Sequence, residues 1–419
     1  MPLHIVGAGW AGLAAAVAAC QRGHAVTLWE ASHQPGGRAR ALPHAGETFD
    51  NGQHILIGAY QATLGLMRTV GVDADAHLLR TPLDLRDAQG HGLQLPALGP
   101  PWDLLWGVWR ARGWSWRDRW ALLRAAARWQ ASGFACPADW SVARLCRQHG
   151  LSDALVRALI EPLCLSALNT AVAQASAAVF LRVLRDALLS GRGGADLLLP
   201  RSDLSTLLVH PALRWLQAHG AELRLGERVS ADTLSAWLAQ ADAAHPVVLA
   251  VPSREAARLT QPLAPAWAQQ AAQLQARAIA TVYLQVDDPG YAGLSRPMLA
   301  LRSDAQAPAQ FVFCRQQLGG HARSIAAVVS DCTLARDALP ARVCAQLRDQ
   351  LGLQALRVRQ TRIERHATFA CTPGLQRPPA QVLPSLWACG DYIDGPYPAT
   401  LEGAVRSGQQ VIAQLAQMG

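Results

Sequence analysis

The stretch LHIVGAGWAGLAAAVAACQRGHAVTLWE, which covers residues 3–30, constrains the fold of this chain more than any other part. Its apolar run Leu3–Val6 predicts a buried strand, and the alanine-rich run Leu13–Gln21 predicts a helix. A second strand is predicted over Ala25–Trp29. A strand, a helix and a second strand in succession form the unit that builds parallel sheets covered by helices. The chain is therefore expected to begin with an α/β domain.

Three glycines and one acidic residue in this stretch have the spacing of a dinucleotide-binding site. In the motif GxGxxG, Gly7 allows a tight turn, Gly9 lets the main chain approach a pyrophosphate, and Gly12 permits close helix–strand packing. Free N–H groups at the start of the helix favour a phosphate charge. Glu30, 18 residues after Gly12, is placed to accept a hydrogen bond from a ribose hydroxyl. The whole pattern predicts a bound dinucleotide.

A second glycine motif shortly after Glu30 narrows the choice of dinucleotide. Residues Gly36–Arg40 read GGRAR, and the pattern E-x5-GGR is not part of ordinary NAD domains. At this point the chain resembles the superfamily of flavin-dependent amine oxidases and phytoene desaturases. The resemblance implies that FAD is the cofactor, that Gly37 passes close to it, and that Arg38 contacts its phosphate or ring region. An Arg side chain suits this role because it is a charged fork with several donors.

The C-terminal segment LWACGDYIDGPYPATLEGAVRSGQQVIAQL is a second match to this superfamily. A strand is expected over Leu386–Cys389 and a helix from about Thr400. The resemblance implies that Gly390 and Asp391 contact the ribityl or pyrophosphate part of FAD. It also implies that the N-terminus of the helix faces the flavin ring, where the helix dipole stabilises negative charge. The residues of this helix taken to bind the cofactor are Glu402 and Ala404.

The segments between the two ends predict a FAD-binding domain that is interrupted twice. A helix is expected over Pro200–His219, followed by the strands AELRLGERV and HPVVLAVPS. By the resemblance, these segments return to the FAD-binding domain, and the main chain of Val229 meets the adenine. Further strands are predicted in RAIATVYLQVDD, AQFVFCRQQ and SIAAVVSD. The predicted fold is an amine-oxidase-like α/β protein: a discontinuous Rossmann-type FAD-binding domain (1–75, 200–265 and 375–419) joined to an α+β substrate-binding domain (76–199 and 266–374).

Two segments of the predicted substrate-binding domain bear on contact with membranes. Pro162–Leu181 carries no charged residue and is long enough to span a bilayer, but its Ser, Asn, Thr and Gln residues favour a buried helix. Pro100–Trp129 holds seven of the fourteen Trp residues, with Arg between them. Trp and Arg together suit a membrane interface, but a helical cap over a substrate cavity uses the same residues. Both interpretations of this segment stay open.

Composition argues against several classes of partner. The net charge is +8 and the chain carries no Lys, so the positive excess comes from Arg alone. Aromatic and basic residues do not interleave in any nucleic-acid motif, so nucleic acid is not an expected partner. The nine cysteines are scattered without a CxxC pair, so neither a metal site nor a disulfide framework is indicated. A cytoplasmic location is expected, either free or peripheral at the inner face of the membrane.

Within the superfamily, three blocks carry a closer resemblance, to the squalene-associated hydroxysqualene dehydroxylases of hopanoid biosynthesis. They are FDNGQHILIGAY, EPLCLSALNTAVAQASAAVFLRVLRD and GDYIDGPYPATLEGAVRSG. The second block matters most, because it lies outside the cofactor motifs. The resemblance implies that the substrate is a hydrophobic isoprenoid, hydroxysqualene, whose allylic hydroxyl group is removed reductively to give squalene. Hydride would come from reduced flavin, with an external electron donor.

This reaction needs an acid, because hydroxide is a poor leaving group, and an apolar pocket without water around the allylic cation. The candidates for the acid are Asp394, Tyr397, His54, Asp50 and Glu161. Each has an ordinary structural alternative: Asp394 suits a turn, His54 a buried core position, and Glu161 the start of a helix. Tyr397 could simply stack on the flavin or line the cavity. We expect Asp394 or His54 to supply the proton.

Other functions remain open from the sequence. A carotenoid or phytoene-type desaturase would run the hydride transfer in the opposite direction with the same cofactor motifs. A polar-amine or porphyrinogen oxidase fits the Trp-rich segment less well, and a non-catalytic lipid-binding module conflicts with the intact set of motifs. The electron donor, the oligomeric state and a covalent link between flavin and Cys371 are not determined by the sequence.

Overall fold

The N-terminal strand–helix–strand unit lies at the centre of a six-stranded sheet in the computed structural model, which describes residues 2–240 and 246–418. Strand β1 pairs in parallel with β2 on one side and with β9 on the other, and only the edge strand β15 runs antiparallel to its neighbour. In order across the sheet the strands are β15 (Gln381–Leu383), β16 (Leu386–Ala388), β9 (Val247–Leu249), β1 (Leu3–Val6), β2 (Val26–Glu30) and β8 (Glu222–Leu225).

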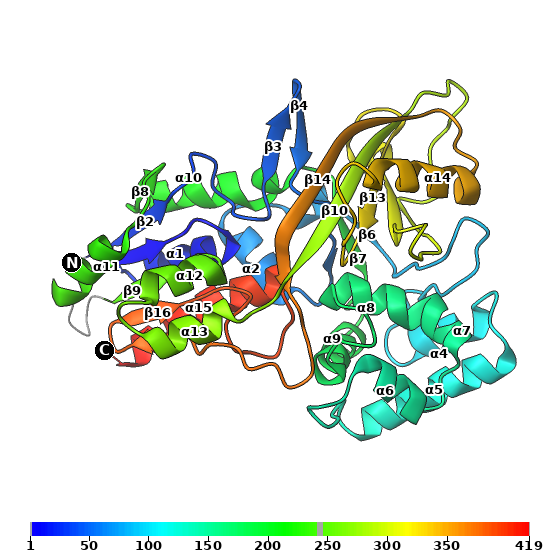
Figure 1. Cartoon of the computed structure of the whole chain (residues 1–419), viewed down its shortest axis with the longest axis horizontal. Coiled ribbons are helices and arrows are strands. Elements are labelled where there is room, and N and C mark those ends of the chain that lie inside the picture. Colours follow the sequence, from blue (N-terminus) through cyan, green and yellow to red (C-terminus); the bar gives the residue numbers. More distant parts are fainter. Residues whose placement is uncertain (1, 241–245, 419) are drawn as a thin grey trace.

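Helix α1 (Trp10–Gln21) packs between this sheet and the C-terminal helix α15 (Leu401–Met418) (Figure 1). Small side chains let the two helices approach closely: a Cβ on Gly408 would lie 2.3 Å from the carbonyl oxygen of Ala11. Helix α1 begins three residues earlier than predicted, directly after Gly9. The other helices of this part are α2 (Gln61–Thr69), α3 (Ala74–His77), α10 (His210–Ala218), α11 (Ala231–Gln240), α12 (Ser253–Thr260) and α13 (Pro265–Ala272).

A second, five-stranded antiparallel sheet stands beside the first, and its long strands β10 and β14 lead away from it (Figure 1). Alternate residues of its strands face opposite sides, as expected of a pleated sheet. One face packs on helix α14 (Leu339–Leu351). In order the strands are β11 (Met298–Ala300), β12 (Phe311–Cys314), β13 (Ser324–Val329), β10 (Ala276–Val286) and β14 (Leu356–Phe369), and the 3-10 turn η3 (Arg315–Leu318) follows β12.

A group of helices forms one end of the molecule, beside the second sheet (Figure 1). Here the prediction of one buried helix over Pro162–Leu181 is wrong, because Asn169, with φ of 47°, ends the first of two helices. No helix in the described ranges is long and apolar enough to cross a membrane. The elements are α4 (Trp102–Arg110), α5 (Trp116–Ala131), α6 (Val142–Gln148), α7 (Asp153–Leu155), the π-helical turn η1 (Val156–Ile160), α8 (Glu161–Leu168) and α9 (Ala177–Leu189).

Two small sheets connect these parts. The position of strand β7 in one of them shows that the helix predicted over Pro200–His219 starts too early. The helix expected from Pro200 begins later, because the apolar run before it forms strand β7 and a π-helical turn, η2 (Ser205–Val209), precedes α10. The small sheets consist of β3 (Ala41–His44) with β4 (Glu47–Asp50), and of β5 (Leu56–Ile57), β7 (Leu197–Pro200) and β6 (Leu78–Thr81). The α/β fold class is confirmed, and the exact limits of the domains stay a prediction.

Candidate active site

A cavity of about 600 Å³ lies where the carboxyl ends of the parallel strands meet the second sheet. Ligand sites of open α/β sheets form at this edge, because the loops that leave the strands there diverge. The cavity brings together most of the residues singled out in the sequence. Those that line it are Gly7, Gly9, Glu30, Gly37, Arg38, His54, Val229, Gly390, Asp391 and Ala404.

At one end of the cavity the main chain forms a cradle without side chains. Gly7 has φ of +108°, and a Cβ there would lie 2.4 Å from the carbonyl oxygen of Ala250. Gly37, with φ of +62°, passes so close to Gly9 that its Cβ would lie 3.2 Å from the Cα of Gly9. Helix α1 starts at this point with no side chain capping its N-terminus. These features leave room and free N–H groups for a diphosphate.

Glu30 anchors the next part of this end. Its Oε2 accepts a hydrogen bond from the N–H of Ala8, and its Oε1 accepts one from the N–H of Ser32, both at 2.8 Å. The carboxylate therefore holds the glycine turn against the end of β2. Val229 lines the same end of the cavity, and the N–H of Glu227 donates to the carbonyl oxygen of Glu30 at 3.0 Å. The segment expected to meet the adenine is thus tied to the residue expected to meet the ribose.

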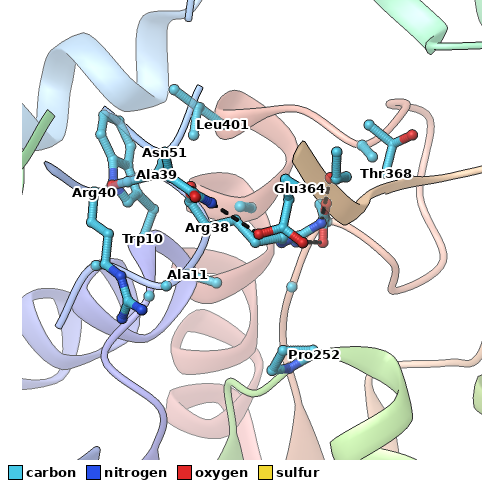
Figure 2. A pocket seen from close by; sticks show the side chains of 18 of the residues that line it. Trp10, Ala11, Arg38, Ala39, Arg40, Asn51, Pro252, Glu364, Thr368 and Leu401 are labelled. Carbon is cyan, nitrogen blue, oxygen red and sulfur yellow. Dashed lines mark hydrogen bonds and ion pairs between the residues drawn. The ribbon is translucent and has the colours of Figure 1, made fainter. Parts of the chain in front are cut away.

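Arg38 joins three distant segments at the middle of the cavity. Its Nη2 lies 2.6 Å from Oδ1 of Asp391, and its Nη1 donates to the carbonyl oxygen of Ala367 at 2.7 Å. Figure 2 shows the Arg38 side chain extending into this region. Both terminal nitrogens of the guanidinium therefore already donate hydrogen bonds within the protein. Direct contact between Arg38 and the cofactor stays a prediction.

The far end of the cavity has an apolar wall that the second sheet provides. Ile279 of β10, Phe311 and Phe313 of β12, and Val328 of β13 line it. Phe311 and Val328 are directly opposite each other in the antiparallel register, so their side chains share a face. The residues between these positions face α14 instead, among them Ala280, Val312 and Ala327. Strand alternation thus turns these four apolar side chains toward the cavity, and Glu364 of β14, the register partner of Ile279, lines the cavity next to them.

Polar groups beside this wall come in part from the segment Asn51–His54, where the N–H of Gln53 donates to Oγ1 of Thr281 on β10 at 3.3 Å. The Nδ2 of Asn51 donates to Oε2 of Glu364 at 2.9 Å, and Figure 2 shows the two side chains pointing toward each other. Nδ1 of His54 lies 2.7 Å from the carbonyl oxygen of Gly52. A carbonyl oxygen only accepts, so this Nδ1 carries a hydrogen and Nε2 of the neutral ring is an acceptor. Burial lowers the pKa of His54 from 6.5, which favours the neutral ring.

The structure does not bring two of the predicted catalytic residues to this cavity. Asp394 is exposed and lies outside the lining. The ring of Tyr397 lies between Arg182 and Arg406, with the guanidinium carbons 5.0 and 5.3 Å from its centroid. Its hydroxyl accepts a hydrogen bond from Nη2 of Arg182 at 3.1 Å. A catalytic role for either residue stays a prediction that this placement does not support.

Two residues of the predicted cofactor set, Gly12 and Glu402, lie outside the lining of the cavity. Gly12 lies behind the cradle, where a Cβ would be 1.8 Å from the carbonyl oxygen of Gly7, so its lack of a side chain permits the predicted packing. Glu402 is 2% exposed, and its Oε2 accepts from the N–H and Oγ1 of Thr63 at 2.9 and 2.8 Å. Its Oε1 accepts from the N–H of Ala62 at 3.0 Å. Glu402 therefore caps α2 rather than facing the cavity.

The remaining candidates also lie outside this cavity. Asp50 is buried behind it, with Oδ1 accepting from the N–H of Leu204 at 2.9 Å. Glu161 is in the first turn of α8, as the structural alternative predicted. Cys371 is buried outside the lining, and burial raises the pKa of its thiol to about 12, so the geometry does not favour a flavin link there.

The polar residues of the lining that sequence reasoning missed include Glu364, Thr368 and Asn169. Glu364 is the only acidic residue in the Arg-rich strand β14, a signal that could have identified it. Thr368 lies four residues further along the same strand, and its Oγ1 accepts from Nδ2 of Asn169 at 3.0 Å. Asn169 itself lies between two helices in an apolar run, where its left-handed conformation gives a Cβ-bearing residue an unusual backbone position.

Comparison with known proteins agrees with this geometry. The family model for flavin-containing amine oxidoreductases matches residues 10–415. The chain belongs to this family. Hydroxysqualene dehydroxylases from Rhodopseudomonas palustris and Sinorhizobium fredii are 30% and 29% identical to it, over 97% of this chain and 96% of each relative. Cyclohexylamine oxidase from Brevibacterium oxydans has the same fold, with a TM-score of 0.65 and 17% identity over 99% of this chain and 98% of that structure.

Membership of the flavin-containing amine oxidoreductases implies FAD, and the residues present fit it. The side-chain-free cradle at Gly7, Gly9 and Gly37 suits the diphosphate. The N-terminus of α15, with Leu401 and Ala404 in the lining, reaches the middle of the cavity beside the apolar wall. An uncapped helix start at one end and a second helix start at the middle therefore match a long, anionic cofactor.

Proposed function

We propose that this flavin-containing oxidoreductase removes the allylic hydroxyl group of hydroxysqualene reductively, giving squalene. Two relatives of this name, similar over nearly the whole chain, support the assignment. The structural observation that carries it is the uncharged wall of Ile279, Phe311, Phe313 and Val328 beside the expected flavin position. An isoprenoid chain has no charge or hydrogen-bonding group to match, so an apolar wall binds it through area buried from water.

The reaction replaces a C–O bond with a C–H bond. The alcohol takes up one hydride and one proton and releases water, so the substrate is reduced by two electrons. FAD, when bound in its reduced form, supplies the hydride, and an external donor must restore the reduced state. The protein's own part is to hold the allylic carbon in an apolar pocket and to deliver a proton to the leaving oxygen.

Two groups of the lining are suited to act on that oxygen. Nε2 of neutral His54 can accept a hydrogen bond from the substrate hydroxyl and so orient it. A proton on this Nε2 makes the ring a donor, and its lowered pKa makes the imidazolium a stronger acid. Glu364 is the second candidate, since it is a carboxyl group of the lining held by Asn51. His54 remains the preferred proton donor and Asp394 is no longer preferred.

Anaerobic incubation of the flavin-reduced protein with hydroxysqualene, followed by chromatography, tests the proposal. Squalene should form in proportion to the reduced flavin consumed. Parallel incubations of oxidised protein with phytoene and with squalene test the alternative desaturase reaction. Products of desaturation in those incubations, with no squalene formed from hydroxysqualene, would replace the proposal by a desaturase. Purified protein without bound flavin and with affinity for isoprenoids would instead indicate a lipid-binding module.

A further inference from the structure

Exposed apolar side chains are concentrated in one short part of the chain. In the described residues nine large apolar side chains are exposed, and seven of these lie between positions 98 and 120. Trp102 and Trp120 are each 65% exposed, although Trp is a residue that proteins usually bury in large part. We call these seven the Trp face: Leu98, Trp102, Leu105, Trp106, Trp109, Trp116 and Trp120.

The Trp face is built by two helices whose other sides hold them to the protein. On α4, Trp102, Trp106 and Trp109 follow the helical repeat of one side, and the buried Gly107 and Val108 lie on the opposite side. On α5, Trp116 and Trp120 are exposed, while Ala121, Leu122, Ala125 and Trp129 are buried. The rings of Trp109 and Trp116 pack edge to face, with centroids 4.9 Å apart, so the two helices present one continuous surface.

The placement of this segment favours one of the two interpretations that the sequence left open for it. No residue between 98 and 129 lines the cavity of the active site. A cap over the substrate would turn its aromatic side chains inward, but these Trp side chains point into solvent. Figure 1 places α4 and α5 at the outer edge of the helical part, away from the six-stranded sheet. This placement does not support a cap over the cavity, and the exposed apolar surface can take a partner.

Charge around the Trp face points to an anionic partner. Residues 98–129 contain six Arg and only two Asp, and Asp118 is used in the capping box of α5. Arg110 and Arg119 lie over the rings of Trp106 and Trp116, at 5.9 and 4.7 Å from the centroids. The other basic side chains on the two helices and the link between them are exposed: Arg112, Arg117, Arg124 and Arg128.

We propose that the Trp face docks this protein on the surface of a bilayer that contains anionic phospholipid. Trp rings and Arg side chains both find partners at the headgroup level, where an apolar body is buried and a polar end stays wet. Helix α4 has nine residues and cannot span the hydrocarbon region, so the two helices lie in the interface plane. A second copy of the chain fits less well, because pairing this face with itself brings Arg against Arg.

Flotation with vesicles of phosphatidylcholine, with and without phosphatidylglycerol, tests this docking on the full-length flavoprotein. Wild-type protein should float with the anionic vesicles, and high salt should weaken that binding because Arg–phosphate attraction is screened. The variant Trp102→Ser/Trp106→Ser/Trp109→Ser should bind about tenfold more weakly or worse. The variant Arg117→Gln/Arg124→Gln should lose roughly fivefold per Arg, on anionic vesicles only. Flavin absorbance and circular dichroism should match the wild type for both.

The matched control is Leu189→Ser/Val358→Ser, which removes the two large apolar side chains that are exposed outside the Trp face in the described residues and should leave binding unchanged. Equal binding by the Trp variant and the wild type would overturn the proposal. So would a wild-type dimer in sedimentation velocity that the same Trp substitutions dissociate, together with no vesicle binding. The outcome is independent of the proposed reaction, since vesicle binding is measured without substrate.

Discussion

Arg38 and Asp391 are 353 positions apart in the chain, yet their side chains form an ion pair of 2.6 Å in the middle of the cavity. The Asp391 side chain is 8% exposed, whereas that of Arg38 is 34% exposed, so solvent screens the pair only in part. The pair ties the GGR loop near the N-terminus to the loop that follows β16. Both loops line the expected flavin position, so the pair assembles the site as well as lining it.

Substitution of either partner should therefore affect both stability and flavin binding. Arg38→Gln or Asp391→Asn should each lower the free energy of unfolding of the flavin-free protein by about 2 kcal/mol, because a charged partner loses its hydrogen bond. The double variant should lose less than the sum, by about 1 kcal/mol. Urea denaturation of the four proteins and flavin titration check this. Strict additivity would show that the pair contributes nothing as a pair.

Glu402 should behave as a structural residue. Glu402→Ala removes the acceptor for two main-chain N–H groups at the start of α2 and for the hydroxyl of Thr63. These buried donors would be left without partners, so unfolding should become easier by about 3 kcal/mol, and Glu402→Gln should cost less. The half-exposed Glu222 is a suitable control, since Glu222→Gln should change stability by about 0.5 kcal/mol or less. Thermal and urea denaturation measure both.

The pH profile of turnover should identify the proton donor. If protonated His54 is the acid, the rate falls as pH rises through a pKa below 6.5, because burial lowers the pKa of the ring. His54→Gln keeps a donor for the carbonyl oxygen of Gly52, but it should lower kcat about 100-fold or more and remove that pH dependence. The comparison variant is Glu364→Gln. The proton donor would be Glu364 if this variant lost more kcat than His54→Gln and if the pH profile of His54→Gln matched that of the wild type.

Asp50 should make the protein less stable as the pH rises. Burial raises the pKa of this carboxyl from 3.8 to about 7, although the N–H of Leu204 donates to it. A pKa that is higher in the folded state contributes stability below about pH 4 and loses it as pH rises through about 7. Relative to Asp50→Asn, the wild type should lose up to about 4 kcal/mol over this range. Urea denaturation at several pH values measures the difference, and parallel curves would contradict it.

The strand–helix–strand unit, the glycine cradle and Glu30 could be read from the sequence, because each depends on neighbours within about 30 residues. The sequence also predicted strands β10, β12 and β13. It did not show which face of these strands meets the cavity, because that depends on α14 covering the other face. The same limit applies to Glu364, which reaches Asn51 from 313 positions away.

Tertiary structure also reversed several expectations that rested on local patterns. Glu402 belongs to the predicted cofactor motif in sequence, but the start of α2 lies beside it and donates hydrogen bonds to its carboxylate. Asp394 occupies an exposed position outside the cavity lining, and the run Pro162–Leu181 bends at Asn169. Local sequence determined which elements form and where the phosphate cradle lies, because backbone propensity and glycine geometry act over short distances. Only the packing of distant segments decided which side chains share the cavity and which face outward, since burial depends on what covers each face.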